Sequence, residues 1–209
     1  MRVMLTSCGL ETEQIKKHFL GILGKEPADT KALFIPTAAI NADAIEVLPK
    51  CMNDLLKCGI PKDNISVFDL HRNMPIDELK TFDVVYLTGG WTSYLLERIN
   101  DTGFRNTLLD YIRDGGFVIG VSAGSIVFAN NLPGNLELLD TKLDVHCNSS
   151  SYTGKVFFPL IENMKLSISH GLYQLMLSNC YHGSVITQSF YLNPVPLFHR
   201  SIGINDLFL

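Results

Sequence analysis

Short apolar runs of strand length alternate with longer segments of helical period through the first two thirds of this 209-residue chain. The short runs contain many β-branched residues, as strands covered on both faces do. They lie at Val3–Thr6, Ala32–Ile35, Ile65–Leu70, Val84–Leu87 and Phe117–Val121. This alternation predicts an α/β fold with a doubly wound, mostly parallel sheet that is flanked by helices.

The helical segments between these runs have start and stop signals. They lie at Glu11–Leu23, Asn41–Leu56, Thr92–Ile99 and Phe104–Arg113. Asn41 and Thr92 are side chains that can cap the first turn of a helix. Pro49 interrupts the second segment, which is therefore either kinked or split in two.

The regular pattern ends after Leu132, where prolines and glycines break it. Lys155–Leu160 and Ser184–Ile186 suggest further β-structure. Because no linker is visible, residues 1–209 are expected to form a single domain. The tail from 163 to 209 has an atypical composition, with few acids and abundant Ser, Tyr, Phe and His.

Composition excludes several classes of protein. Hydrophobic residues make up 46% of the chain and charged residues 18%, which is enough apolar surface for a buried core and rules out disorder. The 17 Lys and Arg against 21 Asp and Glu give a formal charge of −4. With no basic cluster, nucleic acid is not expected as a partner.

Cysteines and apolar runs set the expected compartment. The five cysteines are scattered and form no CxxC pair, so neither a disulfide framework nor a zinc site is expected. No apolar run approaches the ~20 residues of a membrane-spanning helix, and the first residues turn polar too soon for a signal peptide. The chain is therefore expected to be cytoplasmic, without membrane partner, metal or other cofactor. Its sequence does not decide between a monomer and a homo-oligomer.

The motif with the most specific context is Gly120-Val121-Ser122-Ala123-Gly124, which matches G-x-S-x-G. It follows an apolar strand and precedes the helix-compatible stretch Ser125–Ala129, as in a nucleophile elbow. Such a turn holds the nucleophile in strained backbone angles, and small flanking residues avoid clashes. Ser122 is therefore a candidate nucleophile. The alternative is a strand-to-helix turn without chemistry.

A serine nucleophile needs a base and a site for the oxyanion. His146, in Leu143-Asp144-Val145-His146, follows a second apolar stretch and is the best candidate base among six histidines. Gly89-Gly90 lies at the end of a strand, where the Gly90 N–H can join that of Ala123 in binding an oxyanion. The alternative readings are a structural histidine and a simple turn before a helix. Neither G-x-G-x-x-G nor a Walker lysine is present, which disfavours nucleotide binding.

Four segments together resemble the dipeptidase E (aspartyl dipeptidase) family of serine peptidases, relatives of the cyanophycinases. The resemblance covers residues 1–147. The segments are Phe34–Ala39, Val85–Thr92 with Leu95-Leu96, Gly120–Ser125 and Leu143–His146. The resemblance implies an α/β sandwich like that of class I glutamine amidotransferases. It also implies that Ser122 attacks the peptide carbonyl, that His146 carries the proton, and that no cofactor is needed. The family's best-studied substrates are dipeptides with N-terminal aspartate.

The sequence departs from the family pattern in two places. Trp91 stands where the family usually has asparagine, and with Tyr94 it is a candidate pocket residue. The segment where the family carries its triad acid offers no carboxylate here. Asp140, Asp144 and Glu162 are the remaining candidates to orient His146. Arg98, Lys142 and Lys155 are candidate cations for an acidic substrate.

Three functions remain open on the sequence alone. The first is a serine peptidase of small peptides, working either with another acid or as a Ser–His dyad at a reduced rate. The second is a catalytically impaired homologue, with a diverged or frameshifted tail, that binds a peptide or partner. The third is an esterase with the same elbow, although the α/β-hydrolase fold usually places more chain after the nucleophile.

Overall fold

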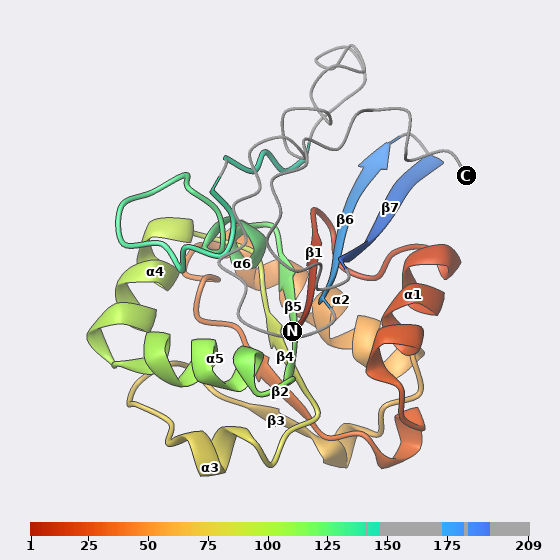
Figure 1. Cartoon of the computed structure of the whole chain (residues 1–209), viewed down its shortest axis with the longest axis horizontal. Helices are drawn as coiled ribbons and strands as arrows, with labels where there is room; N and C mark the ends of the chain where they lie inside the picture. Colours follow the sequence, from red (N-terminus) through yellow and green to blue (C-terminus); the bar gives the residue numbers. More distant parts are fainter. Residues whose placement is uncertain (141, 147–172, 182–183, 193–209) are drawn as a thin grey trace, which may run out of the picture.

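The computed structural model describes residues 1–140, 142–146, 173–181 and 184–192 (Figure 1). Its helices are α1 (Glu13–Leu23), α2 (Ala42–Lys57), α3 (Ile76–Leu79), α4 (Thr92–Asp101), α5 (Phe104–Arg113) and α6 (Ala123–Ile126). Its strands are β1 (Arg2–Thr6), β2 (Ala32–Ile35), β3 (Ile65–Val67), β4 (Val84–Leu87), β5 (Phe117–Val121), β6 (Tyr173–Tyr181) and β7 (Ser184–Leu192).

The described strands form one sheet with the order β3-β2-β4-β5-β1-β6-β7. Every neighbouring pair is parallel except β6 and β7, which run antiparallel. Because β4, β5 and β1 are adjacent and parallel, their carboxyl ends meet at one edge of the sheet. In a doubly wound sheet, such an edge is where a functional site forms. The predicted α/β class is confirmed.

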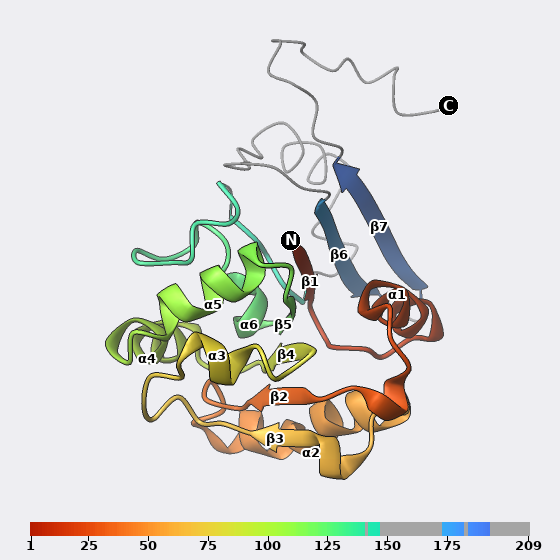
Figure 2. The same cartoon turned by 60° about the horizontal axis from the view of Figure 1, so that its bottom comes forward.

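The strands bury both faces of the sheet because helices cover each side (Figure 2). Alternate strand residues point to opposite faces. Val85, Leu87 and Val118 belong to one apolar cluster, together with residues of α4 and α5. Tyr86 and Ile119 belong to the other, together with residues of α1 and α2. This two-sided burial explains why the strand sequences are continuously apolar rather than alternating.

Several expected boundaries shift for local reasons. The third strand ends at Val67, not at Leu70, because the chain turns away where Thr37 donates to the carboxylate of Asp69 at 2.7 Å. Pro49 does not split α2, which runs through it as one helix. Pro49 is exposed, so solvent can satisfy the carbonyl left without an amide partner.

The helix after β4 is capped one residue earlier than expected. Trp91 occupies the N-cap position and Thr92 is the first helical residue. The reason is that the Trp91 N–H donates to the Ala38 carbonyl at 2.7 Å, which fixes the turn before the helix. The β-structure expected at Ser184–Ile186 belongs to the longer β7, whereas Lys155–Leu160 lies outside the described residues. No apolar pattern had predicted β6.

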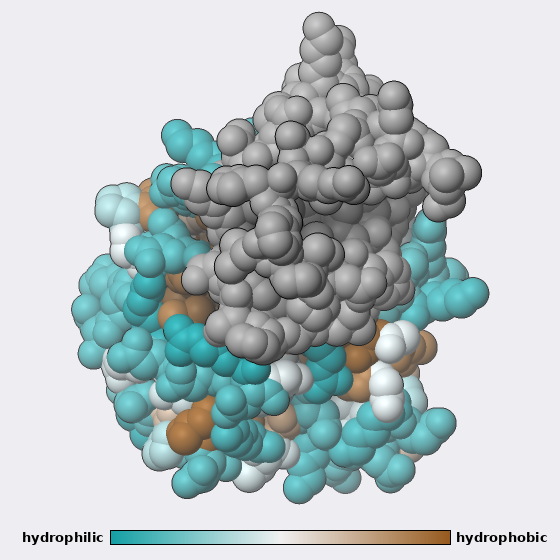
Figure 3. Space-filling view, viewed as in Figure 1, coloured by the Kyte–Doolittle hydropathy of each residue, from teal (hydrophilic) through white to brown (hydrophobic). Residues whose placement is uncertain are grey.

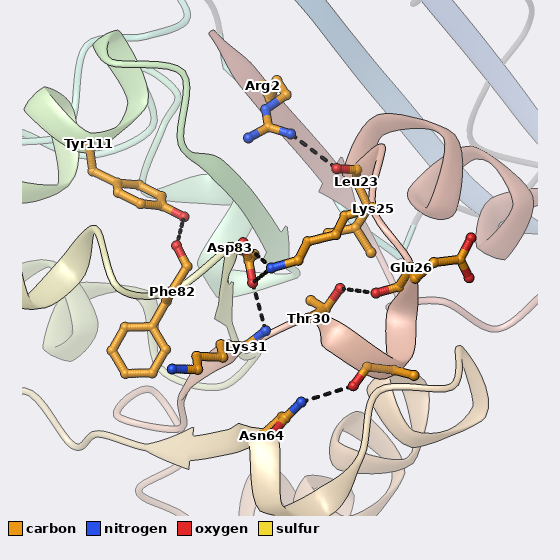
Figure 4. A network of polar contacts seen from close by, with 11 residues as sticks. Arg2, Leu23, Lys25, Glu26, Thr30, Lys31, Asn64, Phe82, Asp83 and Tyr111 are labelled. Atoms are coloured by element: carbon orange, nitrogen blue, oxygen red, sulfur yellow. Dashed lines mark hydrogen bonds and ion pairs between the residues drawn. The ribbon is translucent and has the colours of Figure 1, made fainter.

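Polar contacts fasten the amino-terminal end of the sheet (Figure 4). Asp83 lies directly before β4. The Lys25 ammonium donates to both of its carboxylate oxygens, at 2.9 and 2.8 Å, and the Lys31 N–H donates to one of them at 2.8 Å. The Tyr111 hydroxyl donates to the Phe82 carbonyl at 2.9 Å, and burial raises the pKa of Tyr111 to about 12. These contacts stabilise the edge opposite the one where Ser122 lies.

The visible described surface in Figure 3 is mostly hydrophilic, with small separate hydrophobic areas. Within the described residues, no helix combines the length and apolar character needed to cross a bilayer.

Candidate active site

Ser122 lies between the end of β5 and the start of α6 in a strained conformation. Its φ of 50° and ψ of −109° fall outside the regions that ordinary residues favour. Three hydrogen bonds hold it there: its N–H donates to the Thr6 carbonyl at 2.9 Å, and its own carbonyl accepts the N–H groups of Ser125 and Ile126 at 2.9 and 3.0 Å. This is the geometry of a nucleophile elbow.

Two glycines allow this elbow to pack against the strands. A Cβ on Gly120 would lie 2.3 Å from the Gly124 carbonyl oxygen. A Cβ on Gly124 would lie 2.4 Å from the carbonyl oxygen of Leu87 in β4. Both neighbours are backbone atoms that cannot move aside cheaply. The small residues of the motif are therefore required by packing on both sides of Ser122.

His146 faces Ser122 directly. The Ser122 Oγ and the His146 Nε2 are 2.9 Å apart, which is hydrogen-bonding distance for a nucleophile and its base. Ser122 is half-buried, whereas His146 is exposed and has a φ of 57°. The structure thus brings together the two residues that the sequence singled out, from segments 24 positions apart.

The loop after β1 contacts His146 from the other side. The Cys8 Sγ lies 3.5 Å from the His146 Nδ1, and the His146 N–H donates to the Ser7 Oγ at 3.4 Å. Neither Ser7 nor Cys8 was among the sequence candidates. Their only signal was their place directly after the first strand, at the same sheet edge as Ser122.

Asp54 of α2 supports this loop from beneath. Its carboxylate accepts the Leu10 N–H at 2.8 Å and the Tyr86 hydroxyl at 2.9 Å. The loop packs so closely that a Cβ on Gly9, whose φ is +81°, would lie 2.2 Å from the carboxylate oxygen. Burial raises the pKa of Asp54, and the two hydrogen bonds partly oppose that shift. A buried carboxylate thus fixes the loop that borders His146.

Stability should depend on pH through Asp54. Folding raises the pKa of Asp54 above the ordinary 3.8, so the folded state holds the proton more tightly than the unfolded state. The stability that this proton contributes is therefore complete below about pH 3.8 and is lost as the pH rises through the folded-state pKa. Asp54→Asn removes this titration. We expect the unfolding free energy of Asp54→Asn minus that of the wild type to increase from pH 4 upward and then level off. Urea denaturation across pH 4–8 measures it, and a difference that stays flat or falls contradicts the assignment.

The two backbone N–H groups expected to bind an oxyanion belong to Gly90 and Ala123. Among the described residues, neither the Gly90 N–H nor the Ala123 N–H has an acceptor. Gly90 has a φ of +140°, and a Cβ there would lie 2.1 Å from the Ala38 carbonyl oxygen. The neighbouring Gly89 also lies close to the elbow, since a Cβ there would lie 3.1 Å from the Cβ of Ser122. The Gly-Gly turn therefore packs against both Ser122 and the loop after β2.

For the remaining candidate residues, the structure gives the exposure of the side chain. Asp140 and Asp144 are exposed, and Glu162 lies outside the described residues. At the position where a triad acid would orient the base, the described neighbour of Nδ1 is the Cys8 thiol. Trp91 is 55% exposed and Tyr94 is half-buried, both near the Gly-Gly turn.

Ser125 is a structural residue that the sequence analysis missed. It is fully buried, and its hydroxyl accepts the Thr6 N–H at 3.0 Å. The same Oγ lies 2.8 Å from the Thr6 carbonyl and 2.7 Å from the Gly120 carbonyl, either of which can accept its proton. Ser125 thus joins α6 to β1 and β5, three residues after Ser122. Within the described residues, no cluster of three His, Cys, Asp or Glu side chains could hold a metal ion.

Comparison with known proteins defines the class to which this fold and site belong. The model of peptidase family S51 matches residues 3–144. The chain therefore belongs to peptidase family S51.

Individual relatives agree with this assignment. The chain is 28% identical over 99 residues to an uncharacterized peptidase of Pasteurella multocida, and 29% identical over 99 residues to one of Listeria innocua. Each match covers 47% of this chain, and it spans 48% of the first relative and 47% of the second, about half the length of each.

Solved structures share the fold. A candidate peptidase E from Listeria monocytogenes superposes with a TM-score of 0.55 and 19% identity, covering 89% of this chain and 98% of that one. A peptidase from an acI-B1 actinobacterium superposes with a TM-score of 0.50 and 16% identity, over 92% and 91% of the two chains. At 19% and 16% identity, the likeness to these two structures shows a shared fold alone.

Proposed function

We propose that this peptidase is a serine peptidase of small peptides, with Ser122 as nucleophile and His146 as general base. The observation that carries the proposal is the 2.9 Å approach of the Ser122 Oγ to the His146 Nε2, at a strained strand-to-helix turn. Neither a metal nor an organic cofactor is required. We expect the enzyme to act in the cytoplasm, without nucleic acid or membrane as a partner.

The proposed reaction proceeds by acyl transfer. The Ser122 Oγ attacks the carbonyl carbon of the scissile peptide while its proton moves to the His146 Nε2. The negative charge that develops on the carbonyl oxygen is stabilised by the N–H groups of Gly90 and Ala123. His146 then gives the proton to the leaving amine, which departs and leaves an ester on Ser122. A water molecule, deprotonated by His146, then attacks the ester carbonyl, and the acyl group leaves as a carboxylic acid while His146 returns the proton to the Ser122 Oγ.

The proposal is tested by the release of free amino acids from dipeptides. Asp-Leu is the first substrate to use because of the resemblance to aspartyl dipeptidases, and Leu-Leu, Ala-Leu and Gly-Gly complete a small panel. Turnover of any of them by the purified chain supports the proposal. A folded chain that cleaves none of them, and no ester either, would favour a peptide-binding homologue without activity.

Recognition of an N-terminal aspartate requires a cation near Ser122. Arg98 does not supply it, because its guanidinium donates twice to the Leu70 carbonyl, at 3.2 and 2.8 Å. Lys142 is exposed, four residues before His146, and Lys155 lies outside the described residues. Lys142 is therefore the cation that we propose to test first against Asp-Leu.

Trp91 should favour substrates with an apolar side chain. Its indole is exposed directly after Gly90, and the indole N–H donates to the Ser93 Oγ at 2.5 Å, which fixes the ring. Covering part of this ring would contribute on the order of 1–2 kcal/mol. We expect Trp91→Asn to lower kcat/KM for Leu-Leu about tenfold, mainly through KM, and to leave Gly-Gly nearly unchanged.

The control for Trp91→Asn is Val67→Asn, which changes another exposed apolar residue, on β3 at the far edge of the sheet. Steady-state kinetics on both peptides should separate the two variants. An equal loss for Leu-Leu and Gly-Gly in Trp91→Asn would show that the indole does not select the substrate.

A further inference from the structure

The described groups around the two ring nitrogens of His146 differ in kind. Nε2 faces the Ser122 Oγ at 2.9 Å, and Nδ1 faces the Cys8 Sγ at 3.5 Å. Sulfur hydrogen bonds are longer than those of oxygen, so both contacts are within bonding range. Ser122, His146 and Cys8 therefore form a continuous chain of polar contacts across the imidazole.

Which ring nitrogen of His146 carries the proton decides whether His146 can act as a base. To accept the Ser122 proton, Nε2 must carry a lone pair, and the neutral ring must then carry its proton on Nδ1. With the proton on Nδ1, the Cys8 sulfur is the acceptor of the Nδ1–H. With the opposite tautomer, the thiol would donate to Nδ1 and the ring could not deprotonate Ser122.

The two residues that follow Cys8 in the sequence hold its loop in place. The Gly9 N–H donates to the Thr6 Oγ1 at 3.0 Å, and the Leu10 N–H donates to the buried Asp54 carboxylate. The same loop also binds the His146 backbone through the Ser7 Oγ. The loop thus fixes both the main chain and the ring of His146, which is the task of an orienting residue.

We propose that Cys8 is a positioning residue of this peptidase, whose sulfur accepts the Nδ1–H of His146 and keeps Nε2 ready for the Ser122 proton. The inference rests on the proposed serine mechanism. Cys8 acts through His146 and does not contact the reacting carbonyl. Its sulfur takes the position that a triad carboxylate would occupy.

The proposal predicts a specific set of kinetic effects. Cys8→Ala should lower kcat by about 10- to 100-fold with little change in KM, because the base loses its orientation and the substrate loses no contact. Cys8→Asp should restore kcat to well above the Cys8→Ala value, since a carboxylate is a stronger acceptor for the Nδ1–H. The control is Cys58→Ala, which removes a buried thiol at the end of α2 and should leave kcat unchanged.

A spectroscopic measurement tests the inference without relying on turnover. Long-range ¹H–¹⁵N correlation spectra report which ring nitrogen of His146 carries the proton. We expect the wild type to show the Nδ1–H tautomer and Cys8→Ala to shift toward Nε2–H, because Ser122 remains as an acceptor beside Nε2. The same tautomer in the wild type and in Cys8→Ala would overturn the proposal. If the spectra shift as expected but Ser122→Ala retains turnover, the serine mechanism fails and the contact between Cys8 and His146 stands.

Discussion

Ser122→Ala should reduce peptide hydrolysis by on the order of 10⁴-fold or more while the protein remains folded. The substitution removes the attacking Oγ and the hydrogen bond to His146, and leaves the backbone contacts of the elbow intact. The measurement is kcat/KM on the best dipeptide of the panel. Circular dichroism and urea denaturation establish that the fold is retained.

Ser66→Ala is the matched control for this loss. Ser66 is an exposed serine in β3, at the opposite edge of the sheet from β5. Its removal should change kcat/KM by less than about twofold, since surface substitutions away from special features have small effects. If Ser122→Ala kept most of the wild-type activity, the nucleophile would have to be another residue.

Gly124→Ala should destabilise the fold by about 3 kcal/mol or more. The added methyl group would lie 2.4 Å from the Leu87 carbonyl oxygen and 2.8 Å from the Leu87 Cβ, so β4 and the start of α6 must move apart. This is a large share of the 5–15 kcal/mol of stability that is typical of a domain. Urea denaturation measures it as a lower midpoint.

Gly21→Ala provides the opposite expectation for the same chemical change. Gly21 lies in α1, and a Cβ there would have no neighbour within 4 Å. Because alanine favours the helix over glycine, this variant should gain about 0.5–1 kcal/mol. Equal stabilities of the two variants would mean that the elbow is not packed as tightly as the structure indicates.

The parallel core of the fold was predictable because strands buried on both faces have continuously apolar sequences. Ala32–Ile35, Val84–Leu87 and Phe117–Val121 match their strands residue for residue. The start of α4 depended on a backbone contact with a distant part of the chain, which no sequence pattern shows. Trp91 caps α4 because of the Ala38 carbonyl, which lies more than fifty positions earlier in the chain.

The site was predictable where a motif fixes its geometry. Ser122 lies in such a motif, and His146 followed from its position after an apolar stretch and from the family resemblance. Ser7, Cys8 and Asp54 carry no motif, because their roles arise only when β1, α2 and the His146 segment meet in space. A lone cysteine after a strand gives no signal of its contact with an imidazole.

Labelling with a fluorophosphonate tests most directly whether Ser122 and His146 work as a nucleophile and its base. The reagent reacts preferentially with an activated serine hydroxyl, so it reports on Ser122 and His146 without depending on the right substrate. Mass spectrometry of the digested protein should show one adduct, on the peptide that contains Ser122, and His146→Ala should abolish it. A folded wild type with no adduct, an adduct on another residue, or labelling of Ser122 that persists in His146→Ala would contradict the account.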